Sequence, residues 1–214
     1  MDHQEHNEHT HPGVYEIDCF DRGASKVDFS KSYDLTTLKV GAGTNVTTTT
    51  PSENTLTTGG NIGNSEGTRI IIPIVTRDRE YFAEIRVHLE QITNTEFRFG
   101  FYKDADEYVY IEFDASVDAN WRLTIDDGTG AEFAAEVYGV VALETNYYLR
   151  LWVDPDGKPH WAISTDPKNI EELGITGIDN RMTADGHYCE YYIRTEANLA
   201  KIAEIDYLET IKNK

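Results

Sequence analysis

The sequence has few basic residues and no long apolar run. Its 214 residues include 19 Lys and Arg against 38 Asp and Glu, so the formal net charge is −19. Nucleic-acid phosphates and anionic membrane surfaces both attract clustered Lys and Arg, which this chain lacks. No stretch approaches the run of about 18 apolar residues that a membrane-spanning helix needs. We therefore expect no nucleic-acid partner and no membrane insertion.

Cysteine is also scarce, since Cys19 and Cys189 are the only ones in the chain. Two cysteines in a chain of this length do not make a disulfide framework. Each lies in a strand-like stretch, YEIDCFD and HYCEYYI. We interpret them as small buried apolar side chains, with a single bridge between an early and a late strand as the alternative.

The N-terminus, MDHQEHNEHTHPG, has neither the basic nor the apolar region of a secretory signal. We interpret residues 1–13 as a polar, His-rich arm that cannot bury enough surface to order itself. A neighbouring subunit, a partner or a metal would have to hold such an arm. In an extended chain His9 and His11 lie on one side, and copies of this pair at an oligomer axis would offer nitrogen ligands to a transition metal. A solvated arm without any ligand is the alternative.

Residues 41–67 are almost all Thr, Gly, Asn and Ser. We predict a long surface loop here, with at most a short Thr-rich edge strand at Asn45–Thr50, inside a single domain that covers residues 14–214. A loop of this length is usually functional or contacts a partner, and a flexible insert is the alternative.

From Thr68 onward, apolar and polar residues alternate, with turn signals every eight to twelve residues. The turns DDGTG and DPDGKP contain Asp-Gly, which is typical of hairpins. Only PKNIEELG, residues 167–174, has a helical pattern. Antiparallel strands with one buried face close as two packed sheets. The fold class is therefore all-β, a two-sheet antiparallel jelly roll with an N-terminal arm. The predicted inward residues are Ala83, Ile85, Val87, Leu89, Phe97, Phe99, Phe101, Val109, Ile111, Phe113, Tyr147, Leu149, Leu151 and Val153.

The stretch from Arg98 to the C-terminus carries FRFGFYKD, YVYIEFDASVDANWRLTIDDGTG, TNYYLRLWVDPDGKPHWAIS and YYIRTEANLAKIAEIDYLE. It resembles the concanavalin A-like jelly-roll domains of virion structural proteins from tailed phages and archaeal viruses. The resemblance implies a non-enzymatic capsid decoration, turret or tail-associated subunit. Such a protein would be assembled in the host cytoplasm, reside in the virion and contact other virion proteins and copies of itself through the arm.

The outward positions of the predicted strands carry aromatic and charged side chains. Aromatic rings stack on sugars or on protein partners, and Arg and Glu supply directional hydrogen bonds. The second hypothesis is therefore a carbohydrate-binding module for host-surface glycans. Ordinary cross-strand pairing on a solvated sheet is the alternative. The candidate binding residues are Arg86, His88, Arg98, Tyr102, Tyr110, Glu112, Arg150, Trp152, Tyr192 and Arg194.

Two enzyme families also share this fold class. The segment EIDYLE, residues 204–209, is similar to the E-x-D-x-x-E signature of family 16 glycoside hydrolases. That resemblance implies Glu204 as nucleophile and Glu209 as acid/base, brought to one face of a strand by a bulge. The set Arg86, His88 and Tyr102 is faintly similar to that of alginate lyases. The EIDYLE segment lies close to the end of the chain, whereas the family carries its signature mid-chain, and an acidic row on a terminal strand explains the segment better, so we expect no enzyme activity.

Aspartate pairs in the turns offer oxygen ligands of the kind that Ca²⁺ prefers. Turns also attract Asp without any ion. We expect no obligatory cofactor, with Ca²⁺ or a His-bound transition metal as the candidates. The pairs are Asp104 with Asp106, Asp126 with Asp127, and Asp154 with Asp156.

Overall fold

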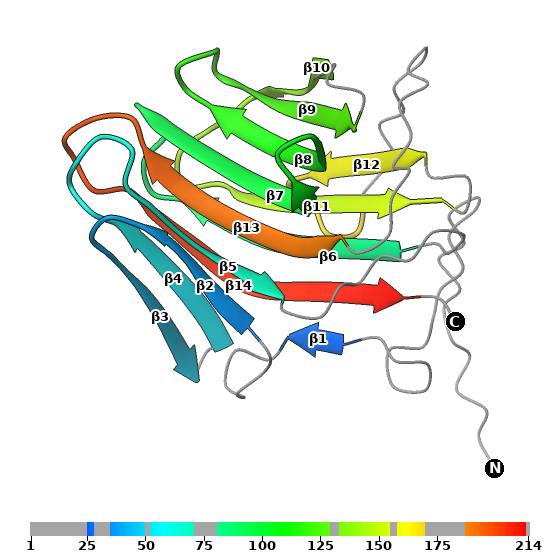
Figure 1. Ribbon diagram of the computed structural model, residues 1–214, viewed down its shortest axis with the longest axis horizontal. Coiled ribbons are helices and arrows are strands. Elements are labelled where there is room, and N and C mark those ends of the chain that lie inside the picture. Colours follow the sequence, from blue (N-terminus) through cyan, green and yellow to red (C-terminus); the bar gives the residue numbers. More distant parts are fainter. Residues whose placement is uncertain are drawn as a thin grey trace.

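The computed structural model describes residues 25–27, 35–49, 52–70, 81–128, 133–154, 158–169 and 187–212. These residues form strands β1 to β14 in two antiparallel sheets that pack face to face (Figure 1). The described residues contain no helix, and hence none long and apolar enough to cross a membrane. The predicted all-β, two-sheet architecture is confirmed.

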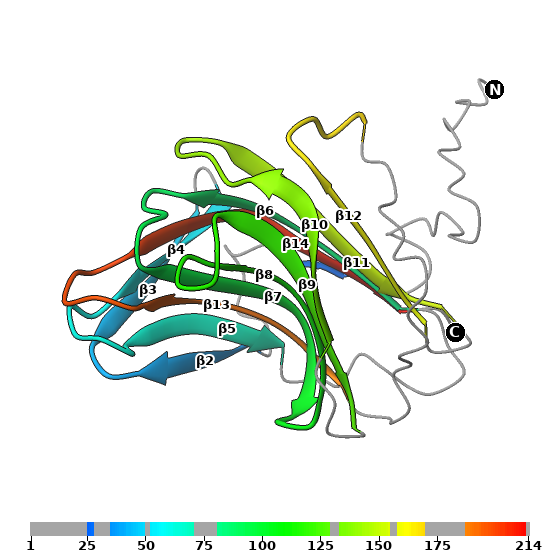
Figure 2. The same cartoon turned by 90° about the horizontal axis from the view of Figure 1, so that it is seen from above.

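The first sheet, sheet I, has the strand order β10-β9-β8-β7-β13-β5-β2. Figure 2 shows its long strands bending along their length, away from the other sheet, so that the outer face of sheet I lies on the inside of the bend. Its strands are β2 (Leu35–Val40), β5 (Ser65–Ile70), β7 (Thr95–Asp104), β8 (Glu107–Asp114), β9 (Asn120–Asp127), β10 (Phe133–Val140) and β13 (Tyr188–Thr195).

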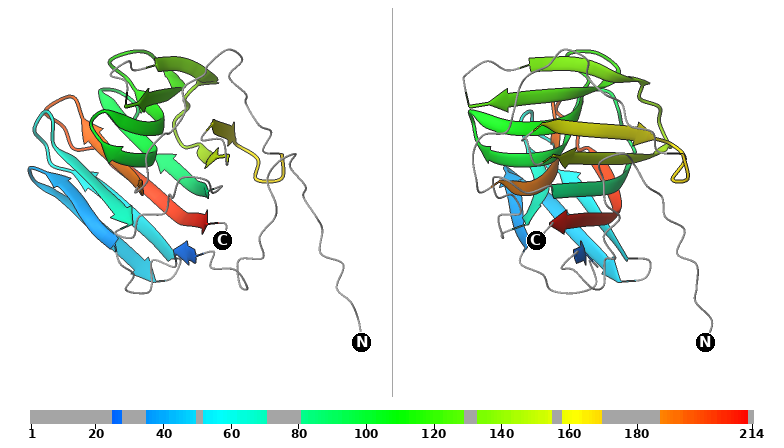
Figure 3. Two further views of the ribbon diagram at one scale, coloured as in Figure 1. Left: turned by 45° about the vertical axis from the view of Figure 1, so that its right-hand side comes forward. Right: turned by 90° about the vertical axis from the view of Figure 1, so that its right-hand side faces the viewer.

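The second sheet, sheet II, has the order β12-β11-β6-β14-β4-β3, and β1 (Ser25–Val27) also pairs with β14. Figure 3 shows the two sheets as separate layers, with the C-terminal strand β14 beside β6 in sheet II. Its other strands are β3 (Gly43–Thr49), β4 (Ser52–Thr58), β6 (Tyr81–Leu89), β11 (Asn146–Val153), β12 (Pro159–Ser164) and β14 (Ile202–Lys212).

The core lies between the two sheets and is built from alternate residues of each strand. Every inward residue predicted from the alternation is buried there. Trp121, at the start of β9, is fully buried and meets the rings of Phe97, Phe113 and Tyr147 edge-on, with centroids 5.4–6.1 Å apart. Aromatic rings prefer this arrangement because the positive edge of one faces the negative face of another.

The long surface loop predicted over residues 41–67 is wrong for most of this range, whereas the short Thr-rich edge strand expected at Asn45–Thr50 is present as β3 at the edge of sheet II. These residues form β3, β4 and the start of β5. The alternation was hidden because polar side chains take inward positions, with Asn54 and Thr58 buried on either side of Leu56. Their polar atoms are hydrogen-bonded: Tyr191 donates to Asn54 (3.2 Å), and the Lys201 amide donates to Thr58 (2.9 Å). The β-branched threonines, which favour strands, were the signal.

Some predictions fall outside the described residues. These are the arm of residues 1–13 with His9 and His11, the environment of Cys19, and most of the helix expected over 167–174. Cys189 is described: it is fully buried in β13, as predicted, and burial raises the pKa of its thiol.

Candidate functional site

The candidate binding residues divide between the two outer faces of the sandwich. Because the sheets pack through their inner faces, these two sets point in opposite directions and do not form one site. Strands β7, β8 and β13 of sheet I carry Arg98, Tyr102, Tyr110, Glu112, Tyr192 and Arg194. Strands β6 and β11 of sheet II carry Arg86, His88, Arg150 and Trp152.

The division rules out the alginate lyase-like set. Arg86 and His88 lie on sheet II, whereas Tyr102 lies on sheet I. The alternation along a strand shows which residues share a face, but it does not show which sheet the strand joins. Arg86, His88 and Tyr102 could therefore be grouped from the sequence although they lie on different sheets.

Arg98 lies at the centre of the outer face of sheet I. Its Nε is 2.9 Å from a carboxylate oxygen of Glu96 and 2.9 Å from one of Glu112. The rings of Tyr110 and Tyr192 flank the guanidinium at 5.6 and 6.0 Å from their centroids. Burial acts to lower the pKa of Arg98, but Tyr192, Glu112 and Glu96 together raise it. Burial in turn raises the pKa of Glu112, and Arg98 opposes that shift.

A second polar cluster lies beside it and includes side chains from the four neighbouring strands β5, β13, β7 and β8. Arg69 in β5 donates to Glu190 in β13 through Nε at 2.6 Å, and its Nη2 is 2.5 Å from the same oxygen. Tyr110 in β8 donates its hydroxyl to the other carboxylate oxygen of Glu190. The Arg69 guanidinium also lies over the rings of Tyr102 (4.7 Å) and Tyr188 (5.5 Å). Arg69 is thus held by charge and by two aromatic faces.

Gly100 makes this cluster possible. Tyr110 and Glu190 are its direct partners on the two strands that flank β7. Strands two apart lie about 10 Å apart, so a side chain on the middle strand would separate these partners. A Cβ at Gly100 would also lie only 2.0 Å from the Val109 carbonyl oxygen.

The third cluster is at the opposite end of the same face. Tyr192 donates to Glu96 at 3.0 Å, and Arg194 donates to its other oxygen at 3.2 Å. Burial raises the pKa of Tyr192, so its hydroxyl stays a donor at neutral pH. The candidate residues predicted from the sequence did not include Glu96, Glu190, Arg69 and Tyr188. Glu190 and Tyr188 alternate with Tyr192 along HYCEYYI, and that period of two was the available signal.

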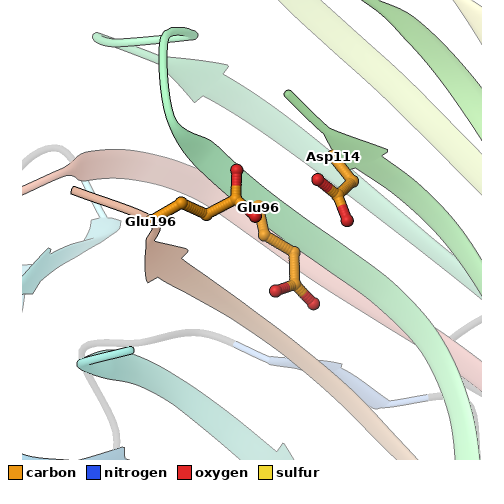
Figure 4. A group of neighbouring side chains, drawn as sticks. All are labelled: Glu96, Asp114 and Glu196. Atoms are coloured by element: carbon orange, nitrogen blue, oxygen red, sulfur yellow. The ribbon is translucent and has the colours of Figure 1, made fainter. Parts of the chain in front are cut away.

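Carboxylates of Glu96, Asp114 and Glu196 lie within 4.8 Å of one another at this end (Figure 4). They come from the start of β7, the end of β8 and the position directly after β13. Burial raises the pKa of Glu196, and repulsion by Asp114 and Glu96 adds to it. Within the described residues, Oε2 of Glu196 has no hydrogen-bond partner.

These carboxylates fit a cation poorly. Glu96 already accepts hydrogen bonds from Tyr192 and Arg194 and lies beside Arg98, so a cation would have to displace them. Ca²⁺ takes six to eight oxygen ligands, more than Asp114 and Glu196 supply.

The turn aspartates predicted as Ca²⁺ ligands stabilise the turns themselves. Carboxylate oxygens of Asp104, Asp126 and Asp154 accept the backbone N–H groups of Asp106, Gly128 and Lys158. This is the ordinary role of Asp in turns. Asp156 lies outside the described residues.

The outer face of sheet II carries a series of pairs. Arg150 contacts Glu84 at 2.5–2.7 Å, and Nδ1 of His88 is 2.9 Å from Glu204. Arg86 lies over the ring of Tyr148 at 5.9 Å.

Trp152, also on sheet II, stacks on His160 at 5.3 Å, and His160 contacts Asp154 at 3.2 Å. Trp152 is buried, so its ring is not presented to a sugar as the sequence analysis expected.

The hydrolase-like segment lies in β14 of sheet II. The register shifts between Ile205 and Tyr207, so that Glu204 pairs with His88 and Glu209 with Glu84. The irregularity expected from the motif is present. Glu204 is held by His88, and the side chain of Glu209 lies outside the described residues, so the catalytic pair that the resemblance implies is not tested.

Comparison with solved structures identifies the fold. A protein of unknown function from Shewanella oneidensis MR-1 matches with a TM-score of 0.67 at 11% identity, over 88% of this chain and 85% of that one. Peanut lectin matches with a TM-score of 0.64 at 10% identity, over 89% and 97%. The exoplasmic/lumenal domain of VIP36, with bound Ca²⁺ and Man3GlcNAc, matches with a TM-score of 0.59 at 10% identity, over 85% and 84%.

The chain has a legume-lectin-like fold. This confirms the concanavalin A-like part of the sequence resemblance. Searches against protein-family models and curated proteins return no match. The comparisons give no support to a virion role, and the location in a virion and the anchoring arm stay predictions.

Proposed function

We propose that the protein binds carbohydrate on the outer face of sheet I. The observation that carries the proposal is the combination of partly exposed tyrosines with hydrogen-bonding groups that are already fixed. Tyr102, Tyr188 and Tyr192 present ring surface, while Arg69 and Arg98 are held in place by buried glutamates. Sugars are recognised by ring stacking and by a few oriented polar groups. Because these side chains are already ordered, binding a sugar would cost little further side-chain entropy.

The fold neighbours support the same class of ligand. The VIP36 domain was solved with Man3GlcNAc, and the matched domain of Emp47p is a carbohydrate recognition domain. The proposal is of binding without bond cleavage, because Glu204 lies on sheet II, on the opposite side of the molecule.

A glycan array, followed by affinity electrophoresis with the strongest hit, tests the proposal. Tyr102→Ala removes a partly exposed ring that contacts an arginine and should weaken binding about tenfold, the effect of losing about 1.4 kcal/mol. The matched control is Tyr148→Ala, which removes a partly exposed tyrosine, also in contact with an arginine, from sheet II. An array without hits, or equal losses in the two variants, would contradict the proposal.

A further inference from the structure

We infer that the outer face of sheet I selects neutral, hydroxyl-rich glycans and rejects anionic ones, because its own glutamates occupy its arginines. This inference rests on the proposed carbohydrate binding and adds the chemical class of the ligand. Arginine clusters on an aromatic surface normally indicate a site for carboxylates or sulfates. Here the pairing within the protein removes that capacity.

The described arginines on the outer face of sheet I are already paired, including Arg122 in β9, which contacts Asp118. Arg69 contacts Glu190 at 2.5 Å, and Arg98 contacts a glutamate on either side at 2.9 Å. Arg194 contacts Glu96 at 3.2 Å. At Arg69 and Arg98, a uronate or sulfate would have to compete with these partners and weaken the pairing of a buried glutamate, which is costly.

The charge around the arginines also disfavours anionic glycans. The side chains of Glu96, Glu112 and Glu190 are at most 7% exposed, and Asp114 and Glu196 add two more carboxylates at one end. The surface therefore carries more negative than positive charge, on a chain of net charge −19. An anionic glycan would be repelled during approach.

A neutral sugar meets none of these obstacles. The carboxylate lone pairs and tyrosine oxygens accept hydrogen bonds from hydroxyl groups, and guanidinium N–H groups not used by the glutamates donate to them. Arg69 cannot easily turn toward a different partner, because it lies over the rings of both Tyr102 and Tyr188. The surface is thus fixed in a state that recognises hydroxyl groups.

The test compares neutral glycans with the carboxymethylated derivatives of the same polymers, by affinity electrophoresis with the full chain. The wild type should bind the neutral polymer at least about tenfold more tightly than its carboxymethylated derivative. Glu190→Gln keeps an acceptor for Tyr110 but frees the charge of Arg69. It should shift the ratio of the two affinities about tenfold toward the anionic polymer.

Glu84→Gln is the matched control, because it frees Arg150 on sheet II from an almost identical contact of 2.5–2.7 Å. This variant should keep the wild-type ratio, and thermal melting shows whether both variants fold. Wild-type binding to carboxymethylated polymers as tight as to neutral ones would overturn the inference while leaving carbohydrate binding in place. An unchanged ratio in Glu190→Gln would also overturn it. Failure to bind either polymer class would overturn the proposed function together with the inference.

Discussion

The two outer faces of the sandwich carry the same kinds of side chain but bury them to different degrees. On sheet I, the carboxylates of Glu96, Glu190 and Glu112 that contact arginines are 3–7% exposed, and only Asp118, beside Arg122 before β9, reaches 28% among the described residues. On sheet II, the carboxylates in ion pairs are 11–34% exposed, as in Glu84 and Glu204. Position on the inside of the bend explains the difference, because successive outward side chains along each bent strand converge there.

This difference in burial determines how much stability is lost when a charged residue of either face is substituted. Buried charges persist only when they are paired and hydrogen-bonded, so the polar groups of sheet I form clusters shared by several strands. On sheet II the His88–Glu204 pair is better solvated, with side chains 24% and 34% exposed, so water can replace a lost partner there. A rigid, fixed surface is expected on sheet I and a tolerant one on sheet II.

The largest expected effect comes from Arg98→Met, which removes the charge between Glu96 and Glu112 but keeps similar bulk. Two nearly buried carboxylates would then lose a counter-charge, so the free energy of unfolding should fall by about 3–4 kcal/mol at neutral pH. The same substitution in sheet II, Arg150→Met, should cost about 1–2 kcal/mol, because it leaves one carboxylate, that of Glu84, without its partner instead of two. Urea denaturation of both variants measures the difference, and equal losses would refute the contrast between the faces.

A smaller loss of stability is expected from Gly100→Ala. This substitution tests whether the absence of a side chain at this position is needed for Tyr110 and Glu190 to meet across β7. The new Cβ would meet the Val109 carbonyl oxygen and the Tyr110 Cα, forcing β7 and β8 apart. We expect a loss of about 2 kcal/mol, typical of overpacking. Gly139→Ala in β10 is the control, since a Cβ there meets nothing within 4 Å. A melting temperature for Gly100→Ala as high as that of this control would show that the close approach is not needed.

The alternation of the sequence was sufficient for the core and for the faces. It placed Phe99 and Val109 inward and Arg98 and Glu112 outward, as the structure has them. It failed where polar residues take inward positions, as Asn54 does in β4, because the pattern then disappears.

Partners that are distant in the chain could not be predicted in the same way. Arg69 and Glu190 are 121 residues apart and meet only because β5 and β13 are neighbours in sheet I. The order of strands in a sheet depends on the packing of the whole domain, and so does the bend that buries the outer face of sheet I. The local periodicity of the sequence gives neither the strand order nor the bend.

The smallest effect concerns Glu196, at the end of sheet I where three carboxylates converge. Burial and repulsion raise its pKa above 4.5, so its charged form is less stable in the folded chain than in the unfolded one. Protonated Glu196 therefore makes its full contribution to the stability of the wild type below pH 4.5. This contribution is lost as the pH rises through the pKa that the group has in the folded chain.

Glu196→Gln removes this pH-dependent cost. In metal-free buffer the variant should be more stable than the wild type by about 0.5 kcal/mol at pH 7, a small value because water screens the partly exposed group. The difference should vanish near pH 4, and Glu90→Gln, at an exposed position after β6, is measured beside it as the surface control. Thermal melts at both pH values measure this. A variant less stable than the wild type at pH 7 would show that attraction within this cluster outweighs repulsion. If that reversal appeared only after Ca²⁺ was added, the cluster would be a cation site, contrary to the poor fit of Glu96.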